Sequence, residues 1–267
     1  MVQLDPTGFL DLGDQQLEYR HLGPRPDEAP AIVLLHEGLG CAGLWLDFPD
    51  RLAAATGAGV FVYSRAGYGA SSPVTLPRPL TYMHDEALVV LPRVLDAIGF
   101  RAGMLLGHSD GGSIAAIHAG GVRDPRVKGI SLIAPHFFTE EMGLASIALA
   151  REKYENDDLR PRLARWHRDV DNTFWGWNGA WLDPDFRAWN LTEYLPTIGC
   201  PVQVMQGDAD IYGTFAQVET LERMAPGPVE VVRIPGVGHS PHREAPEVAR
   251  DAASSFFKRI FSTVEAT

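Results

Sequence analysis

Short apolar runs alternate along the chain with longer stretches whose apolar residues recur at helical spacing. The continuous apolar runs at residues 31–36, 59–64 and 102–107 have the length of buried strands, and further strands are expected at residues 17–22, 127–134, 202–206 and 229–234. Helices are expected at residues 44–55, 82–98, 112–120, 215–224 and 246–261. Strands that alternate with helices favour an α/β fold, in which a mostly parallel central sheet is covered by helices on both faces.

Two of the expected helices carry local start signals. Thr214, with Gln217 three residues later, has the form of a capping box. Pro246 suits the first turn of the last helix, where a backbone N–H would have no partner in any case.

The stretch 135–196 breaks the alternation of strands and helices. It contains no clear strand, and residues 147–154 and 159–170 are expected to be helical. Five of the six tryptophans fall here, at positions 166, 175, 177, 181 and 189. We expect this insertion to form a lid over the strand ends. Most of its indoles should form its own small core, and Trp175 and Trp177 are candidates for facing a pocket.

Composition narrows the class of protein. The 267 residues suffice for one domain with an insertion, and 45% hydrophobic with 21% charged residues is ordinary for a soluble protein. A formal net charge of -11 argues against nucleic acid and anionic membranes as partners. The two cysteines, Cys41 and Cys200, indicate neither a disulfide framework nor a zinc site. Without a signal-peptide pattern or a long apolar run, the expectation is a cytoplasmic protein whose partner is a small-molecule substrate.

The run Gly107-His108-Ser109-Asp110-Gly111 has the form of a nucleophile elbow, a sharp turn from a strand into a helix. Such a turn holds its serine in a strained conformation that lifts the hydroxyl into a cleft. Glycines flank the serine because a Cβ there would collide with the neighbouring strand and helix. Ser109 is therefore the candidate nucleophile.

A serine hydroxyl needs a base to accept its proton and a carboxylate to orient that base. His239 follows the last expected strand in Gly236-Val237-Gly238-His239, a loop that can present an imidazole to a cleft. Asp208 and Asp210 both follow the strand at 202–206, and we assign the acid to Asp210 and a turn-forming role to Asp208.

The reaction also needs two backbone N–H groups that face the developing negative charge. One is expected from Asp110, directly after the nucleophile. The other is expected from the loop after the strand at 31–36, where Gly38 is the first choice and Leu39 the alternative.

These motifs together resemble the α/β-hydrolase fold, and the resemblance covers nearly the whole chain. The matching runs, in chain order, are His36-Glu37-Gly38, Gly67-Tyr68-Gly69-Ala70-Ser71, Gly107 to Gly111, Gly207-Asp208-Ala209-Asp210 and Gly238-His239. The order Ser109, Asp210, His239 is the order of this fold. The resemblance implies a hydrolase core of residues 1–134 and 197–267, an inserted helical cap of residues 135–196, and no metal or organic cofactor.

Glu37 departs from the family pattern, which usually has glycine at this position. The structural interpretation is an exposed carboxylate or one paired with Arg65, and the functional interpretation is contact with a polar substrate group or a water. His136 and Tyr212 lie near expected strand ends and are candidate pocket residues. His108 is expected to point away from the cleft, and His242 to support His239.

The expected chemistry is two-step acyl transfer on an ester through Ser109. Thioester, lactone or carbon–carbon bond hydrolysis would use the same residues and a different pocket. A further alternative is a ligand receptor on a hydrolase scaffold, which would bind tightly with negligible turnover. The sequence leaves the substrate and the oligomeric state open.

Overall fold

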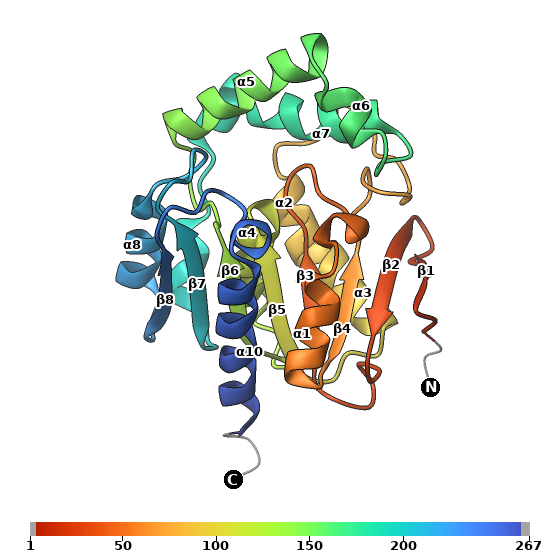
Figure 1. Cartoon of the computed structure of the whole chain (residues 1–267), viewed down its shortest axis with the longest axis vertical. Coiled ribbons are helices and arrows are strands. Elements are labelled where there is room, and N and C mark those ends of the chain that lie inside the picture. The colour runs from red at the N-terminus through yellow and green to blue at the C-terminus, as the bar shows by residue number, and fades with distance from the viewer. Residues whose placement is uncertain (1–3, 263–267) are drawn as a thin grey trace.

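The computed structural model describes residues 4–262 and has at its centre a sheet of eight strands (Figure 1). The strands are β1 Thr7–Asp11, β2 Gln16–Leu22, β3 Ala31–Leu35, β4 Gly59–Tyr63, β5 Gly103–His108, β6 Val127–Ile133, β7 Val202–Gly207 and β8 Val229–Ile234. Their order in the sheet is β1-β2-β4-β3-β5-β6-β7-β8. β1 pairs antiparallel with β2 and β2 with β4, and every later pairing is parallel.

The expected fold class is confirmed, and one strand was not predicted. In β1 only Leu10 is buried, so this edge strand has no apolar run by which the sequence could reveal it. In contrast, all residues of β3, β4 and β5 are buried, as expected for central parallel strands with helices on both faces.

Two apolar clusters cover the two faces of the sheet. Val33 and Leu35 of β3 belong to one cluster, and the alternate residues Ile32 and Leu34 belong to the other. Helices α1 (Phe48–Thr56) and α10 (Pro246–Ser262) contribute to the second cluster, together with the 3-10 turn η1 (Ala42–Trp45). Helices α3 (Leu91–Ala97), α4 (Asp110–Ile117) and α8 (Phe215–Met224) contribute to the first.

Several helices differ from their expected bounds. The helix expected at 82–98 consists of α2 (Tyr82–Asp85), the π-helical turn η2 (Glu86–Val90) and α3. The helix expected at 112–120 begins earlier, at Asp110, and ends in a second π-helical turn, η3 (His118–Val122). A one-turn helix, α9 (Pro241–Glu244), follows β8 and was not predicted.

The capping box predicted at α8 is wrong in one half. Thr214 does cap the helix, but its side chain accepts from the N–H of Ala216. The Gln217 side chain does not return to the cap: it accepts from Phe137 N at 2.8 Å and donates to Phe138 O at 3.0 Å. Gln217 thereby holds the start of the inserted segment against α8.

The segment 135–196 contains α5 (Glu141–Asn156), α6 (Leu159–Leu163), α7 (Val170–Trp181) and the 3-10 turn η4 (Pro184–Ala188), and it ends within the 3-10 turn η5 (Thr192–Thr197). Figure 1 shows α5, α6 and α7 together above one end of the sheet. The single helix predicted at 159–170 is wrong, because Asp169 caps a new helix by accepting from Asn172 N at 3.0 Å. None of the described helices is long and apolar enough to cross a bilayer.

Candidate active site

Ser109 lies in the sharp turn between β5 and α4. Its backbone has φ 52° and ψ −117°, a left-handed conformation that costs energy for a residue with a side chain. A Cβ on Gly107 would overlap the backbone of Gly111, and a Cβ on Gly111 would overlap the carbonyl of Leu35. The two glycines therefore allow β5, α4 and β3 to approach closely enough to form this turn.

A continuous relay of hydrogen bonds joins Ser109, His239 and Asp210. Ser109 Oγ lies 2.9 Å from His239 Nε2, and His239 Nδ1 lies 2.8 Å from Asp210 Oδ2. Because the Asp210 carboxylate accepts, His239 carries its proton on Nδ1 and offers the Nε2 lone pair to the serine hydroxyl. The three residues that the sequence predicted for the triad are thus within hydrogen-bond reach of one another.

The Asp210 carboxylate is buried and held by two further donors. Gln206 Nε2 donates to Oδ2 at 2.8 Å, and the Tyr212 N–H donates to Oδ1 at 2.8 Å. Burial alone would raise the pKa of Asp210, but the hydrogen bond from His239 and the positive charge it can carry outweigh burial and lower this pKa. Asp210 is therefore suited to remain ionised beside His239.

Glu244 fixes the loop that carries His239. Its Oε2 accepts from the Gly238 N–H at 2.8 Å and its Oε1 from the Ser240 N–H at 2.9 Å, so one carboxylate binds the residues on both sides of the imidazole. Sequence analysis gave Glu244 no role, because a bidentate contact to backbone groups has no spacing signature.

The two backbone N–H groups predicted to bind an oxyanion come from elements that lie side by side. The Asp110 N–H is at the first position of α4 and so has no partner within that helix. Gly38 follows β3, which pairs directly with β5. The indole of Trp177 covers Gly38 so closely that a Cβ there would overlap its nitrogen. Only glycine at position 38 allows this contact.

A buried arginine holds the loop of Gly38. The guanidinium of Arg65 is fully buried and donates to the carbonyl oxygens of His36 and Glu37, the second at 3.1 Å. Arg65 N also donates to His36 Nε2 at 3.1 Å. Two residues directly before Gly38 are therefore fixed to the turn after β4.

The predicted pairing of Glu37 with Arg65 is wrong. Arg65 binds the Glu37 backbone, while the Glu37 carboxylate turns toward His108, whose Nδ1 lies 3.4 Å from Glu37 Oε2. The side chain is one-fifth exposed (21%) rather than free in solvent. The Arg65 guanidinium is instead used by the backbone carbonyl oxygens of His36 and Glu37.

A cavity of about 180 Å³ opens beside Ser109. It is lined by Glu37, Gly38, Leu39, His108, Ser109, Asp110, His136, Ile147, Trp177, Trp181, Tyr212, His239 and Ser240. Of the five pocket residues predicted from the sequence, Trp175 does not line it. Trp175 instead packs edge-on against Tyr154 and Phe174 within the inserted segment.

Trp181 lines the cavity and was not singled out from the sequence. Its Nε1 donates to the Tyr82 hydroxyl at 3.0 Å, and that hydroxyl donates to Asp110 Oδ2 at 2.5 Å. Trp177 and Trp181 lie four residues apart on α7 and so face the same side of the helix. Trp175 is two residues before Trp177, which turns it to another face.

The rings of His136 and Tyr212 flank His239, with ring centroids 5.5 Å and 4.7 Å from it. Burial lowers the pKa of His136 to about 3, so this ring is neutral near pH 7. Burial also raises the pKa of Tyr212, so its hydroxyl stays protonated. Both side chains therefore present neutral, polar rings to the cavity.

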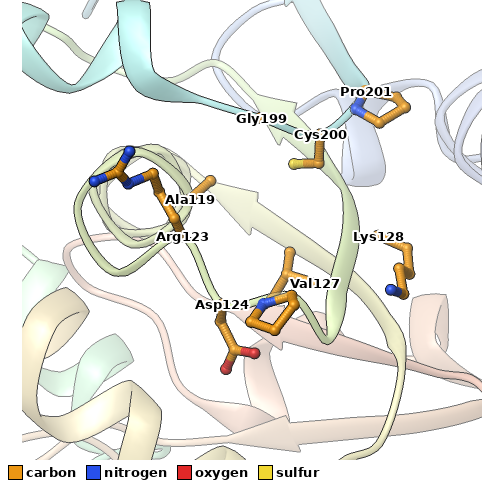
Figure 2. Close-up of a pocket in the computed structure, with 9 residues that line it drawn as sticks. Ala119, Arg123, Asp124, Val127, Lys128, Gly199, Cys200 and Pro201 are labelled. Atoms are coloured by element: carbon orange, nitrogen blue, oxygen red, sulfur yellow. The ribbon is translucent and has the colours of Figure 1, made fainter.

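A larger depression of about 350 Å³ lies elsewhere, around the start of β6 and the residues before β7 (Figure 2). Figure 2 shows Arg123, Asp124, Lys128 and Cys200 around it, together with Pro201. It shares no residue with the cavity at Ser109. Burial raises the pKa of Cys200 to about 11, so its thiol is a poor nucleophile. The candidate nucleophile Ser109 lines the smaller cavity.

Fold and site together define an α/β hydrolase with a serine beside an imidazole and a carboxylate. Residues 32–252 match the sequence profile of the alpha/beta hydrolase family. The match spans far more than half of the chain, so this protein belongs to the alpha/beta hydrolase family. Membership of this family supports hydrolase activity.

Comparison with curated proteins gives a shorter match. The chain is 30% identical over 124 residues to a proline iminopeptidase from Lactobacillus delbrueckii subsp. lactis. Those residues are 46% of this chain and 42% of the relative, so the match spans less than half the length of either protein.

Two solved structures illustrate the likeness in fold. The proline iminopeptidase of Mycobacterium smegmatis has a TM-score of 0.75 at 19% identity, covering 97% of this chain and 99% of that one. A carboxylesterase structure from the ammonia-oxidizing thaumarchaeon Nitrososphaera gargenis has a TM-score of 0.74 at 20% identity, covering 96% and 100%. At such identities the likeness concerns the fold alone.

Proposed function

We propose that this protein is a serine hydrolase that cleaves a carboxylic ester, or a related thioester or lactone, of a small and largely apolar substrate. The observation that carries the proposal is the relay from Ser109 Oγ through His239 to Asp210, with distances of 2.9 and 2.8 Å. The strained backbone of Ser109 supports it, because such strain persists where the surrounding structure holds a residue for chemistry.

The reaction begins when His239 takes the hydroxyl proton and Ser109 Oγ attacks the carbonyl carbon. The N–H groups of Gly38 and Asp110 stabilise the resulting oxyanion. His239 then gives its proton to the leaving alcohol, which departs and leaves an acyl group on Ser109. Water, deprotonated by His239, attacks this acyl group and frees the acid and the serine.

The cavity supports a small substrate. Its volume of about 180 Å³ lies below the roughly 300–1,000 Å³ of pockets for drug-sized ligands. Trp177, Trp181 and Ile147 come from the segment 135–196, which we propose acts as a cap domain over a core of residues 1–134 and 197–267. Their apolar surfaces suit a short acyl or aromatic group.

The test combines active-site labelling with a substrate panel. A fluorophosphonate probe should label the protein, and Ser109→Ala should abolish both labelling and turnover while leaving the circular-dichroism spectrum unchanged. Labelling that persists in Ser109→Ala would overturn the assignment of the nucleophile.

The panel separates the possible substrate classes. We expect rapid multiple turnover of aryl esters with short apolar acyl groups, and slower turnover of polar or long-chain ones. Equal rates across the panel would contradict the apolar pocket. A prolyl amide tests the peptidase activity named for one relative, and a vinylogous diketone tests carbon–carbon hydrolysis. Tight binding of product without turnover of any substrate would instead indicate a receptor.

A further inference from the structure

Glu37 and His108 meet at the wall of the cavity beside Ser109, in contact with the loop that carries His239. His108 is 1% exposed, and its Nε2 lies 2.8 Å from the carbonyl oxygen of His239. Its Nδ1 lies 3.4 Å from Glu37 Oε2. The Glu37 carboxylate folds back over Gly40, where a Cβ would overlap both of its oxygens. A side chain at position 40 would therefore displace the Glu37 carboxylate from this place.

The contact on Nε2 determines where one proton of His108 lies. A carbonyl oxygen only accepts hydrogen bonds, so His108 must donate from Nε2. In a neutral ring Nδ1 would then be a lone pair, and it would face a carboxylate oxygen that also only accepts. Two acceptors repel each other, so the approach to 3.4 Å favours a second proton on His108 or on Glu37. Imidazole is a stronger base than a carboxylate, which favours the proton on His108.

We propose that Glu37 and the buried His108 form an ion pair that positions His239. The imidazolium donates from Nε2 to the His239 carbonyl oxygen, and a charged donor makes a stronger hydrogen bond than a neutral one. Glu37 is adjacent in sequence to Gly38. The pair therefore joins the loop of the candidate oxyanion donor to the loop of the candidate base. Neither side chain is assigned a step in the reaction, so both are positioning residues.

The other groups around His108 are compatible with a single positive charge on it. His242 of α9 packs against it with ring centroids 4.7 Å apart, and burial lowers the pKa of His242 far below its usual range, so this ring is neutral. His239 lies 5.1 Å away between ring centroids, and the Trp45 indole covers another side at 6.4 Å. Burial by itself would raise the pKa of Glu37, but its interaction with His108 outweighs burial and lowers it.

A direct test measures the protonation of His108 in the full chain. Nitrogen-15 spectra of the imidazoles at pH 8 should show one imidazolium among the nine histidines of the native protein. Glu37→Gln should remove that signal, and the exposed control Glu219→Gln on α8 should keep it. A native spectrum with only neutral imidazoles at pH 8 would overturn the ion pair. This measurement does not use the proposed reaction, so its failure leaves the labelling of Ser109 unaffected.

A kinetic test rests on the proposed hydrolase function and uses the sign of a pH shift. In the ion pair, Glu37→Gln removes the anion and the His108 proton together, so a cation close to His239 is lost and His239 protonates more easily. The acid limb of kcat/KM should then move to higher pH by up to roughly 0.5 unit, because the lost cation lies about 5 Å from His239 and the loss of the anion offsets part of its effect. KM should change little while kcat falls several-fold.

Other protonation states of Glu37 and His108 predict different shifts of the acid limb. If Glu37 is charged and His108 neutral, Glu37→Gln removes only an anion and the acid limb moves to lower pH. If both groups are neutral, the limb does not move. Either result contradicts the proposal. The control Glu219→Gln should not change the pH of the acid limb.

Discussion

Trp177 lies directly over Gly38, with its indole nitrogen where a Cβ of residue 38 would be. The contact joins α7 of the inserted segment to the loop after β3. It places an apolar wall of the cavity against the backbone N–H proposed to bind the oxyanion. The size of residue 38 therefore affects both the position of the Trp177 indole in the cavity wall and the position of the backbone N–H of residue 38.

Gly38→Ala should lower kcat by about 10²–10³, the usual cost of losing one oxyanion donor. The added methyl group must displace either the indole or the loop, and overpacking of this kind costs about 1–3 kcal/mol of stability. Steady-state kinetics and urea unfolding measure the two effects. Gly179→Ala is the control, because a Cβ there meets nothing within 4 Å on the same helix. Unchanged kcat in Gly38→Ala would remove Gly38 from the proposed oxyanion hole.

Arg65→Met should destabilise the protein and reduce kcat together. The substitution leaves the carbonyls of His36 and Glu37 without their buried donor, and an unsatisfied buried polar group costs about 1–3 kcal/mol. Urea unfolding and ester hydrolysis measure the losses. The exposed Arg101→Met should show neither. A stable Arg65→Met protein with full kcat would mean that the loop keeps its shape without the guanidinium.

Glu244→Gln should reduce kcat roughly tenfold with little change in KM, which corresponds to about 1.4 kcal/mol of transition-state stabilisation. A glutamine has one acceptor oxygen, so one of the N–H groups of Gly238 and Ser240 loses its partner and the His239 loop loosens. Glu222→Gln, exposed on α8, is the matched control. Equal kcat values in both variants would show that the loop is rigid without Glu244.

His136→Gln should make the protein less sensitive to acid. The pKa of His136 is lowered to about 3 in the folded protein, against about 6.5 in an unfolded chain. Between these pH values the unfolded chain binds a proton that the folded protein does not, so stability falls as pH falls. Each such histidine lowers the free energy of unfolding by up to about 1.4 kcal/mol for each unit by which the pH falls.

Urea unfolding at pH 7 and pH 4.5 measures this linkage. Between pH 7 and pH 4.5, the free energy of unfolding of the native protein should fall by about 2–3 kcal/mol more than that of His136→Gln. Buried His36 and His242 contribute to the acid sensitivity of both proteins alike, because burial lowers both of their pKa values. Equal losses would indicate that His136 is protonated in the folded state at pH 4.5.

Sequence patterns predicted the central strands and helix α8 well, because buried parallel strands leave continuous apolar runs. The central strands β3 and β4 begin at the expected residues, and helix α8 has the expected bounds. The edge strand β1 was missed because it buries only Leu10. The helix expected at 159–170 was wrong because Asp169 starts a new helix, a capping effect that outweighs local apolar spacing.

The sequence by itself determined the family and the order of Ser109, Asp210 and His239, because the turns that carry them need glycine and polar residues at fixed spacing. Only the tertiary structure decided the partners of Glu37 and Arg65, the role of Glu244, and the choice of Trp177 and Trp181 over Trp175. These depend on contacts between segments far apart in the chain. Such contacts are selected by the packing of whole elements, and they leave no periodicity in the sequence of either partner.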